Sequence, residues 1–356
     1  MIRRLAAILG VALAAGAAVS AALLIAESGH GSPGRREPDT RAAPAARQRE
    51  PALDRRRTFY VSPAGHDSSA GTSPATAWRS VLTVDRARLA PGDTVLFQGG
   101  AVFADAPLMP GRGTAASGSP GLPITFGSYG NERARLTQGV WFDGDRHLSF
   151  RDLILGPATG IAGDGLQGSG DHIRIERLEI AHVILGIESV GNNWTIADTD
   201  IHHTGDSGML LGYDAGRPGD PPGGSGYVIT RNAITDTGLN PRYRYGTHGI
   251  YLKVANATVT DNTISHFHDD GISIRYRDNT VTGNHISDGP IGLAWFQYDD
   301  RPGTSTWHDN TLTGITNTGI FVCGPREGCR RPLEQFSLAG NTVQGRTSVP
   351  AIVGGT

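Results

Sequence analysis

Lys253 is the only lysine among the 32 basic residues of this 356-residue chain, and Arg275 follows it 22 residues later. Arginine keeps its proton near neutral pH, whereas lysine can lose its proton when burial or a neighbouring cation lowers its pKa. At one site the lysine could therefore act as a general base while the arginine binds the carboxylate of an acidic sugar. The alternative is a solvated lysine without a catalytic role.

Other reactive side chains recur at the same interval around this lysine. Aligning Gly249 with Gly271 places His248 over Asp270, Tyr251 over Ser273 and Lys253 over Arg275. In a solenoid, residues at the same position of successive coils lie about 4.8 Å apart, so the alignment predicts one outward-facing patch. The candidate catalytic residues are Lys253, Arg275, His248, Tyr251 and Asp270. The candidate substrate-binding residues are Asp269, His268, Arg242, Tyr243, Arg244 and Tyr245.

Three inserted segments lengthen the coils near this patch, at Gly212–Gly226, Gly238–Thr247 and Tyr298–Ser305. Arginine and tyrosine side chains in loops on a rigid solenoid are typical of the walls of a carbohydrate groove. A surface insertion without a function is the alternative.

Two histidines stand beside the acidic pair of the patch. His266 and His268 with Asp269 and Asp270 could bind a cation or form a hydrogen-bond network. Carboxylates suit calcium better than imidazoles do. A structural or catalytic role of His268 is the preferred interpretation, so no metal ligands are assigned.

A repeat supplies the elements that must position these residues. Asparagine recurs at positions 232, 262, 284, 310 and 341, always two residues before an aliphatic one, at intervals of 30, 22, 26 and 31 residues. A glycine followed by alternating apolar residues comes later in each coil, as at Gly249–Leu252. One coil cannot bury its own apolar face, so neighbouring coils must stack. The asparagines are predicted to form a hydrogen-bonded ladder at a turn, and Asp198, Asp200, Asp261 and Asp309 are predicted turn formers.

Three further motifs precede the repeat: Tyr60-Val-Ser-Pro-Ala-Gly-His-Asp67, Pro91-Gly-Asp-Thr-Val95 and Ser119-Pro-Gly-Leu-Pro-Ile-Thr-Phe126. Together with the repeat they resemble the right-handed parallel β-helix repeat proteins of the pectate-lyase-like superfamily, many of them secreted by bacteria. The resemblance covers about residues 58–345. It implies an all-β fold, a right-handed parallel β-helix (solenoid) with an N-terminal cap containing a short helix. The apolar spacing of Val81–Leu89 predicts that helix.

The chain divides into five predicted parts. Residues 1–26 are expected to be a signal peptide or N-terminal membrane anchor, and 27–57 a disordered linker rich in Pro, Arg and Ala. The N-terminal cap and first coils are expected over 58–130, the β-helix repeats over 131–345 and a C-terminal tail over 346–356. Both interpretations of the N-terminus predict a protein outside the cytoplasm, either secreted (extracellular) or anchored at the cell surface. In such a protein, Cys323 and Cys329 are expected to form a small-loop disulfide.

Composition limits the classes of partner. The formal net charge of −2 argues against nucleic acid, which requires a concentrated basic surface. The 50 glycines and the frequent Thr, Asn and Asp favour strands and turns over long helices. The expected partner is a polysaccharide bound by a monomer, with membrane contact only through the N-terminal segment.

The resemblance also suggests a reaction. Lys253 and Arg275, one coil apart, resemble the base-and-arginine arrangement of polysaccharide lyases. Such lyases neutralise a uronate carboxylate, often with calcium, remove the C5 proton and eliminate the 4-linked sugar. His248 or Tyr251 would then protonate the leaving oxygen. No cofactor is assigned, and Ca²⁺ is the candidate.

Three alternatives stay open. Tyr245-Gly-Thr-His248 is faintly similar to the Tyr and His of alginate epimerases, although their Asp-Pro-His motif is absent from the sequence. Asp269, Asp270 and Asp206 could pair for an inverting glycoside hydrolase, but His248-Gly249 precedes Asp269-Asp270, the reverse of the order in polygalacturonase-type hydrolases. A non-catalytic carbohydrate-binding or surface solenoid is the third.

Overall fold

The computed structural model describes residues 56–111, 116–213, 215, 217, 219–243, 246–298, 301–323, 335–344 and the backbone of 352–354. All of them belong to one compact unit. The expected signal peptide or anchor and nearly all of the expected linker lie outside these ranges, so both stay predictions. Within the described ranges, no helix has the length and apolar character needed to cross a membrane.

The chain winds through three parallel sheets, A, B and C, and each regular coil adds one short strand to each sheet. Sheet A contains β1 (Thr58–Val61), β2 (Thr94–Gln98), β4 (Ile124–Tyr129), β7 (Leu148–Arg151), β10 (Arg174–Glu176), β13 (Thr195–Ala197), β17 (Val228–Thr230), β20 (Thr258–Thr260), β23 (Thr280–Thr282), β26 (Thr304–His308) and β29 (Gln335–Ser337). Sheet B contains β3 (Val102–Phe103), β5 (Ala134–Leu136), β8 (Leu153–Leu155), β11 (Glu179–Ala181), β14 (Asp200–His202), β18 (Ala233–Thr235), β21 (Thr263–Ser265), β24 (His285–Ser287), β27 (Thr311–Thr313) and β30 (Thr342–Gln344). Sheet C contains β6 (Val140–Arg146), β9 (Leu166–Asp171), β12 (Ile187–Asn192), β15 (Met209–Leu211), β19 (Ile250–Leu252), β22 (Asp270–Ile274), β25 (Ile291–Phe296), β28 (Thr318–Cys323) and β31 (Ile352–Gly354), and β16 (Gly224–Ser225) pairs with β12.

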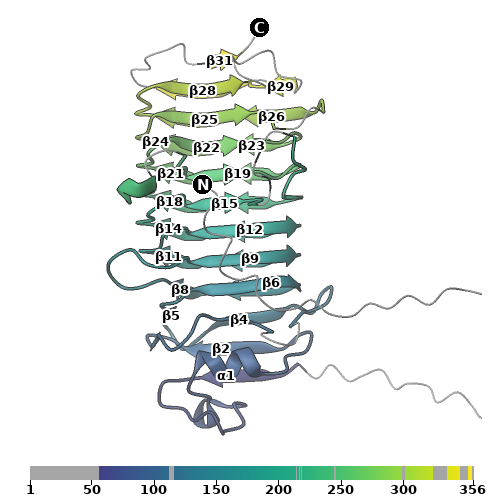
Figure 1. Ribbon diagram of the computed structural model, residues 1–356, viewed down its shortest axis with the longest axis vertical. Helices are drawn as coiled ribbons and strands as arrows, with labels where there is room; N and C mark the ends of the chain where they lie inside the picture. The colour runs from purple at the N-terminus through teal and green to yellow at the C-terminus, as the bar shows by residue number, and fades with distance from the viewer. Residues whose placement is uncertain are drawn as a thin grey trace, which may run out of the picture. The chain divides into compact units, whose positions relative to one another are not determined.

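Helical structure is confined to short pieces in the described ranges. They are η1 (Pro74–Thr76), α1 (Val81–Arg86) and η2 (Pro241–Tyr243). The Ser80 hydroxyl accepts a hydrogen bond from the Thr83 amide at 3.2 Å and so caps the start of α1. Figure 1 shows α1 beside β2 at the N-terminal end of the stack. The predicted short helix is present and ends at Arg86, because Ala87 adopts an extended backbone conformation.

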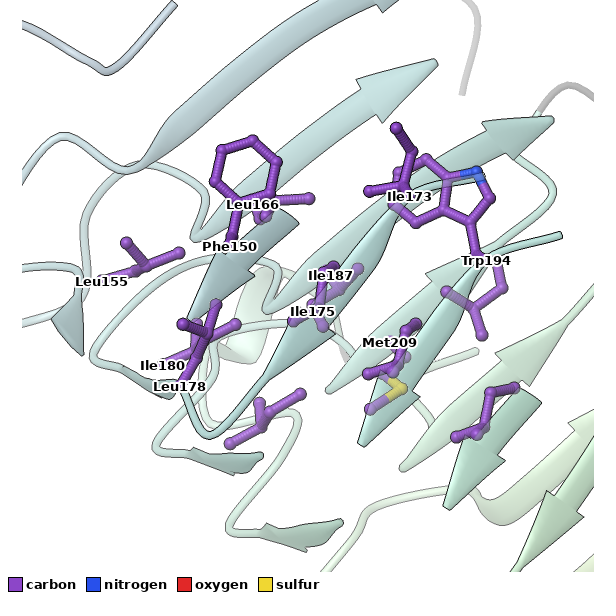
Figure 2. Close-up of a cluster of buried hydrophobic side chains, with 14 of the residues drawn as sticks. Phe150, Leu155, Leu166, Ile173, Ile175, Leu178, Ile180, Ile187, Trp194 and Met209 are labelled. Carbon is purple, nitrogen blue, oxygen red and sulfur yellow. The ribbon is translucent and has the colours of Figure 1, made fainter. Parts of the chain in front are cut away.

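The core lies inside the coils. In each strand, alternate side chains point inward, so one coil contributes an apolar residue from each of three directions. Ile175 of β10, Ile180 of β11 and Ile187 of β12 form one such layer, and all three are fully buried. Figure 2 shows these three isoleucines among the residues of neighbouring layers. The sharing of one core by successive coils confirms the predicted all-β solenoid.

The asparagine ladder is present as predicted. The side-chain amide of Asn232 donates to Oδ1 of Asn262 at 2.9 Å, and the amide of Asn262 donates to Oδ1 of Asn284 at the same distance. The series continues through Asn310 to Asn341. Each link joins two coils at the turn between sheets A and B. The ladder therefore fixes the register of these coils from inside.

In these coils a turn of two residues, the first of them left-handed, separates the strands of sheets A and B. Asp198, Asp261 and Asp309 have φ values of 53°, 56° and 55°. Aspartate tolerates this conformation better than most residues do. Three of the four predicted turn formers therefore occupy such turns, whereas Asp200 begins β14. At the other end of the chain, β31 pairs with β28 in the segment that was expected to be a tail.

Candidate functional site

The predicted patch lies on sheet C, where β19, β22 and β25 run side by side (Figure 1). The register between β19 and β22 pairs Ile250 with Ile272, Tyr251 with Ser273 and Leu252 with Ile274. This is the alignment predicted from the 22-residue interval. It sets Lys253 beside Arg275, one residue after the paired segment, and His248 beside Asp270, two residues before it.

Glycine starts these strands because nothing larger fits. A Cβ atom on Gly249 would lie 2.5 Å from Cγ2 of Ile264 and 2.6 Å from the carbonyl oxygen of Gly271. After this close approach, the side chains alternate between the core and the outer face of sheet C. Ile250 and Leu252 are fully buried in the core, whereas Tyr251 lies on the outer face and is half-buried.

A buried hydrogen-bond network runs beneath the site. The Ser273 hydroxyl donates to Oδ2 of Asp270, and Nη1 of Arg275 donates to the Ser273 hydroxyl at 2.8 Å. Nδ1 of His248 lies 3.4 Å from the same Asp270 oxygen and accepts a hydrogen bond from the Asp270 amide at 3.3 Å. The network thus connects His248, Asp270, Ser273 and Arg275 in one chain.

Burial governs the charges in this network. It lowers the pKa of His248 well below its ordinary value, and the positive charges of Arg275 and Lys253 act in the same direction. The imidazole is therefore neutral at neutral pH. Burial also raises the pKa of Asp270 to about 6, and the charge of Asp269 adds to this effect while the Ser273 hydrogen bond opposes it.

Above the network, two cations pack against aromatic rings. Nζ of Lys253 and Cζ of Arg275 each lie 4.6 Å from the centre of the Tyr251 ring. The Arg275 guanidinium also lies 4.6 Å from the Phe296 ring and 5.5 Å from the Tyr298 ring. Its Nε is buried, and no described residue accepts a hydrogen bond from it. One N–H donor of the Arg275 guanidinium is therefore without an acceptor among the described residues.

The phenol groups of Tyr251 and Tyr298 lie next to each other beside these cations. The hydroxyl oxygens of Tyr251 and Tyr298 lie 3.4 Å apart. Burial raises the pKa of Tyr251 to about 12. Burial also acts to raise the pKa of Tyr298, but the Tyr251 hydrogen bond and the charges of Arg275 and Lys253 outweigh it, and the net shift is downward. Neighbouring phenols with opposite shifts are the pattern expected of an acid and a base.

The pKa of Lys253 also falls. Burial is the largest cause, and the positive charge of Arg275 adds to it, whereas Tyr298 and two acidic residues act in the opposite direction. An ammonium group that loses its proton more easily is compatible with the predicted role of Lys253 as the base. A Tyr298 phenolate beside the ammonium would oppose this fall and favour its charged form.

The first inserted segment closes one side of the site. The Tyr276 hydroxyl donates to the carbonyl oxygen of Asp220 at 2.9 Å, and the Gly219 amide donates to the carbonyl oxygen of Tyr298 at 2.6 Å. The Gly223 amide donates to the carbonyl oxygen of Lys253 at 3.1 Å. The insertion is therefore attached to the strand ends that carry the two cations.

The patch is less exposed than the alignment predicted. His248 and Asp270 are each 2% exposed, Arg275 is 7% and Lys253 is 8% exposed. The rings of Tyr251, Phe296 and Tyr298 cover Arg275, as the contacts above show. The outward-facing patch predicted from the alignment is therefore buried at these four residues, and at Arg275 the covering rings of Phe296 and Tyr298 come from a third coil.

The predicted substrate-binding residues lie around this centre and are not all in the site. Asp269 is half-buried, and its Oδ2 accepts a hydrogen bond from the Gly246 amide at 3.0 Å. His268 is exposed, and the Cβ position of Gly238 would lie 3.1 Å from its Cβ, so the second insertion passes close to it. Arg242 is exposed and Tyr243 half-buried in η2. Arg244 and Tyr245 lie outside the described residues.

Sequence reasoning placed Ser273 beside Tyr251 without giving it a role, and it missed Phe296 and Tyr298 as members of the site. Phe296 ends β25, and Ser273 and Ala294 are paired in adjacent strands. Extending the glycine alignment from Gly271 to Gly292 by one more coil would have placed Phe296 beside Arg275. The available signal was the alternation Ala294, Phe296, Tyr298 on the outer face.

The described residues test neither the calcium prediction nor the disulfide prediction. Among the described residues, no group of three or more His, Cys, Asp or Glu side chains is arranged to hold a metal ion. Cys323 ends β28, and Cys329 lies outside the described residues, so the disulfide stays a prediction.

Comparisons with known proteins bear on the fold. No curated protein matches this chain. A lacto-N-biosidase from Eubacterium ramulus is similar in structure, with 14% identity, a TM-score of 0.49, and coverage of 81% of this chain and 68% of that one. A rhamnogalacturonan lyase has 13% identity and a TM-score of 0.49 over 80% of this chain and 87% of its own. An alginate lyase from Paenibacillus sp. str. FPU-7 has 17% identity and a TM-score of 0.43 over 82% and 99%. At such identities and TM-scores, neither a reaction nor a substrate is transferred from these proteins.

A match to a protein-family model identifies the family of this chain. The model described as the right handed beta helix region matches residues 159–342, just over half of the chain. These residues include every strand from β9 to β29 and the whole of the site described above. The match agrees with the three parallel sheets and with the predicted handedness. The chain therefore belongs to the right-handed β-helix family.

Proposed function

We propose that this protein is a lyase that cleaves an acidic, uronate-containing polysaccharide by β-elimination. The observation that carries the proposal is the meeting of two cations with two phenols, whose hydroxyl oxygens are 3.4 Å apart. Elimination needs a group that neutralises the carboxylate, a base for the C5 proton and an acid for the leaving oxygen. All three kinds of group are within this cluster.

Arg275 and Lys253 are the proposed carboxylate ligands. Neutralising the carboxylate makes the C5 proton more acidic, because negative charge spreads onto the carboxylate as the proton leaves. The position of the two cations supports this role, since both lie against the Tyr251 ring and a carboxylate held by them would lie beside the phenols. The bond from Arg275 to Ser273 would hold the guanidinium in place, which makes Ser273 and Asp270 positioning residues.

The proton transfers are assigned to the tyrosines. Tyr298, as phenolate, would take the C5 proton, and the C–H electron pair would form the C4=C5 double bond while the C4–O bond breaks. Tyr251, which keeps its proton, would give it to the leaving glycosidic oxygen. The two phenols then exchange a proton to return to the starting state. This assignment moves the base from Lys253 to Tyr298 and keeps Lys253 as the second cation.

The alternatives have less support. Inverting hydrolysis needs two carboxyl groups that face the substrate, and Asp270 is buried and hydrogen-bonded to Ser273. Epimerisation begins with the same loss of the C5 proton but requires a proton donor on the opposite face of the ring. A non-catalytic solenoid would not need two cations gathered beside two phenols.

The deciding experiment is a panel of acidic polysaccharides incubated with the full chain. Elimination creates an unsaturated uronide, whose ultraviolet absorbance would rise with time. A new reducing end without that absorbance would indicate hydrolysis. Altered proton spectra without chain cleavage would indicate epimerisation, and binding without any product would indicate a carbohydrate-binding solenoid. Only the first of these four results is consistent with the proposal.

A further inference from the structure

We infer that the substrate is a polymer of uronate residues in which the C5–H and C4–O bonds lie on the same face of the sugar ring. This inference rests on the proposed function and adds the stereochemistry of the elimination. D-Mannuronate and D-glucuronate linked through O4 have this configuration. D-Galacturonate, L-guluronate and L-iduronate have the two bonds on opposite faces.

The geometry of the phenols is the first step. Tyr251 lies on the outer face of β19, and Tyr298 follows β25, two strands further along the same sheet. Both side chains are half-buried, and their hydroxyl oxygens meet at 3.4 Å. A sugar ring bound at this place would therefore have both hydroxyl groups on one side of it.

The second step is the separation that each stereochemistry requires. An acid and a base act at hydrogen-bond distance from their targets, about 3 Å between heavy atoms. When the proton and the leaving oxygen are on opposite faces, the two groups must stand on opposite sides of the ring, roughly 6 Å or more apart. When they are on the same face, neighbouring groups can reach both targets. The observed 3.4 Å fits the second case.

The cations are consistent with this orientation. Lys253 and Arg275 pack against the Tyr251 ring, each 4.6 Å from its centre. The carboxylate is bonded to C5, the same carbon that loses the proton. Held by these cations, it would bring the C5–H bond to the phenols rather than to a group across the ring.

Pairs of C5 epimers test the inference directly. Polymannuronate and polyguluronate differ in the configuration at C5, and glucuronate-rich and iduronate-rich polymers form a second such pair. Polygalacturonate supplies a substrate whose C4 configuration is inverted instead. Each polymer is incubated with the full chain, and the unsaturated product is followed by its ultraviolet absorbance. Binding of each polymer is measured separately with the Tyr298→Phe variant.

The expected result is unsaturated product from polymannuronate or from the glucuronate polymer, and at least 100-fold less from the epimer. Unsaturated product from polyguluronate, the iduronate polymer or polygalacturonate at a comparable rate would overturn the inference and leave the lyase proposal intact. Absence of unsaturated product from all five polymers would overturn the lyase proposal itself. Binding of an uncleaved epimer would show that stereochemistry, not affinity, makes the difference.

Discussion

At the residue scale, the two tyrosines differ because their surroundings differ. Both phenols are partly buried, and burial alone raises the pKa of each. The Tyr298 hydroxyl also lies at hydrogen-bond distance from the Tyr251 hydroxyl and near two cations, and these neighbours lower its pKa. Tyr251 is the proposed proton donor of the pair. A shared hydrogen bond therefore makes one phenol more acidic at the expense of the other.

Replacing Tyr298 and Lys253 separately identifies the base. We expect Tyr298→Phe to lower kcat by about 10³-fold or more, because general-base catalysis contributes roughly 10²–10⁴-fold. Lys253→Arg keeps a cation beside the carboxylate, so we expect it to retain at least about a tenth of the activity. The measurement is the initial rate of ultraviolet absorbance increase on a cleaved polymer.

A matched control comes from sheet A. Tyr60 is half-buried on β1, outside the site, so Tyr60→Phe should leave the rate unchanged. If Lys253→Arg were inactive while Tyr298→Phe kept most of its rate, the base would be Lys253, as the sequence first suggested.

Asp270 links the site to stability through its protonation. Its pKa is raised to about 6 in the folded protein, mainly by burial, against about 3.9 in an unfolded chain. Between these values the folded state binds more protons than the unfolded state does. The contribution of Asp270 to the free energy of unfolding must therefore fall as the pH rises through this window, by about 2–3 kcal/mol in all.

The Asp270→Asn variant removes this titration and nearly preserves the shape. We expect the free energy of unfolding of the natural protein, relative to the variant, to decrease between pH 4 and pH 6, measured by urea unfolding at several pH values. His248 faces Asp270 and acts in the opposite direction, because burial lowers its pKa, but it is present in both proteins. A difference between the proteins that does not change with pH would contradict the raised pKa.

At the element scale, the asparagine ladder supplies hydrogen bonds between coils that the short strands do not make. The strands next to it contain only three residues each, such as β20 and β21. The turn between them leaves backbone groups that no strand partner satisfies. Oδ1 of Asn262 accepts hydrogen bonds from the amide of Asn232 at 3.0 Å and from its side chain at 2.9 Å. The ladder thus replaces the missing sheet hydrogen bonds inside the turn.

Removing one asparagine of the ladder should therefore lower the free energy of unfolding. Asn262→Ala would leave the Asn232 amide and the Ile229 carbonyl, which now bonds to Nδ2 of Asn262, without these partners inside the protein. We expect the free energy of unfolding to fall by about 3–5 kcal/mol, since each buried unsatisfied group costs roughly 1–3 kcal/mol. Urea unfolding followed by circular dichroism measures this loss.

Thr263, the next residue, is the control for this variant. Its side chain is exposed on β21, so Thr263→Ala should cost less than about 1 kcal/mol. Equal losses in the two variants would mean that the ladder contributes no more than strand propensity does.

At the scale of the whole stack, aromatic rings join the coils of the N-terminal half. Phe150 stacks on Phe126 at 5.2 Å and on Phe142 at 5.6 Å, and the series continues through Trp194 to Tyr227. Figure 2 shows Phe150 and Trp194 in the same core. Because each coil contacts mainly its neighbours, stability is passed along the stack through such shared layers.

Phe150→Ala tests this dependence. We expect a loss of about 3–5 kcal/mol in the free energy of unfolding, because the fully buried ring leaves a cavity between coils. The site lies several coils away, so kcat without denaturant should stay within about twofold. An exposed residue of comparable location, Val102, supplies the control variant Val102→Ala, which should change neither quantity. Loss of activity at full folding would contradict a stack that is coupled only through neighbours.

The sequence by itself determined the coil, the register of β19 with β22 and the asparagine ladder. Those features depend on residue types at nearly fixed intervals: glycine where a Cβ has no room, aliphatic residues at inward positions and asparagine at one turn. Such preferences are local and repeat from coil to coil. They therefore leave a pattern that is readable without coordinates.

Only the tertiary structure decided which residues complete the site and how deeply it is buried. Tyr298 comes from a third coil, and its distance to Tyr251 depends on how that coil packs over Arg275. His248 and Asp270 are buried as well, which their residue types do not predict. Protonation follows from burial and neighbouring charge rather than from residue type, so the opposed shifts of the two tyrosines could not be predicted from the sequence.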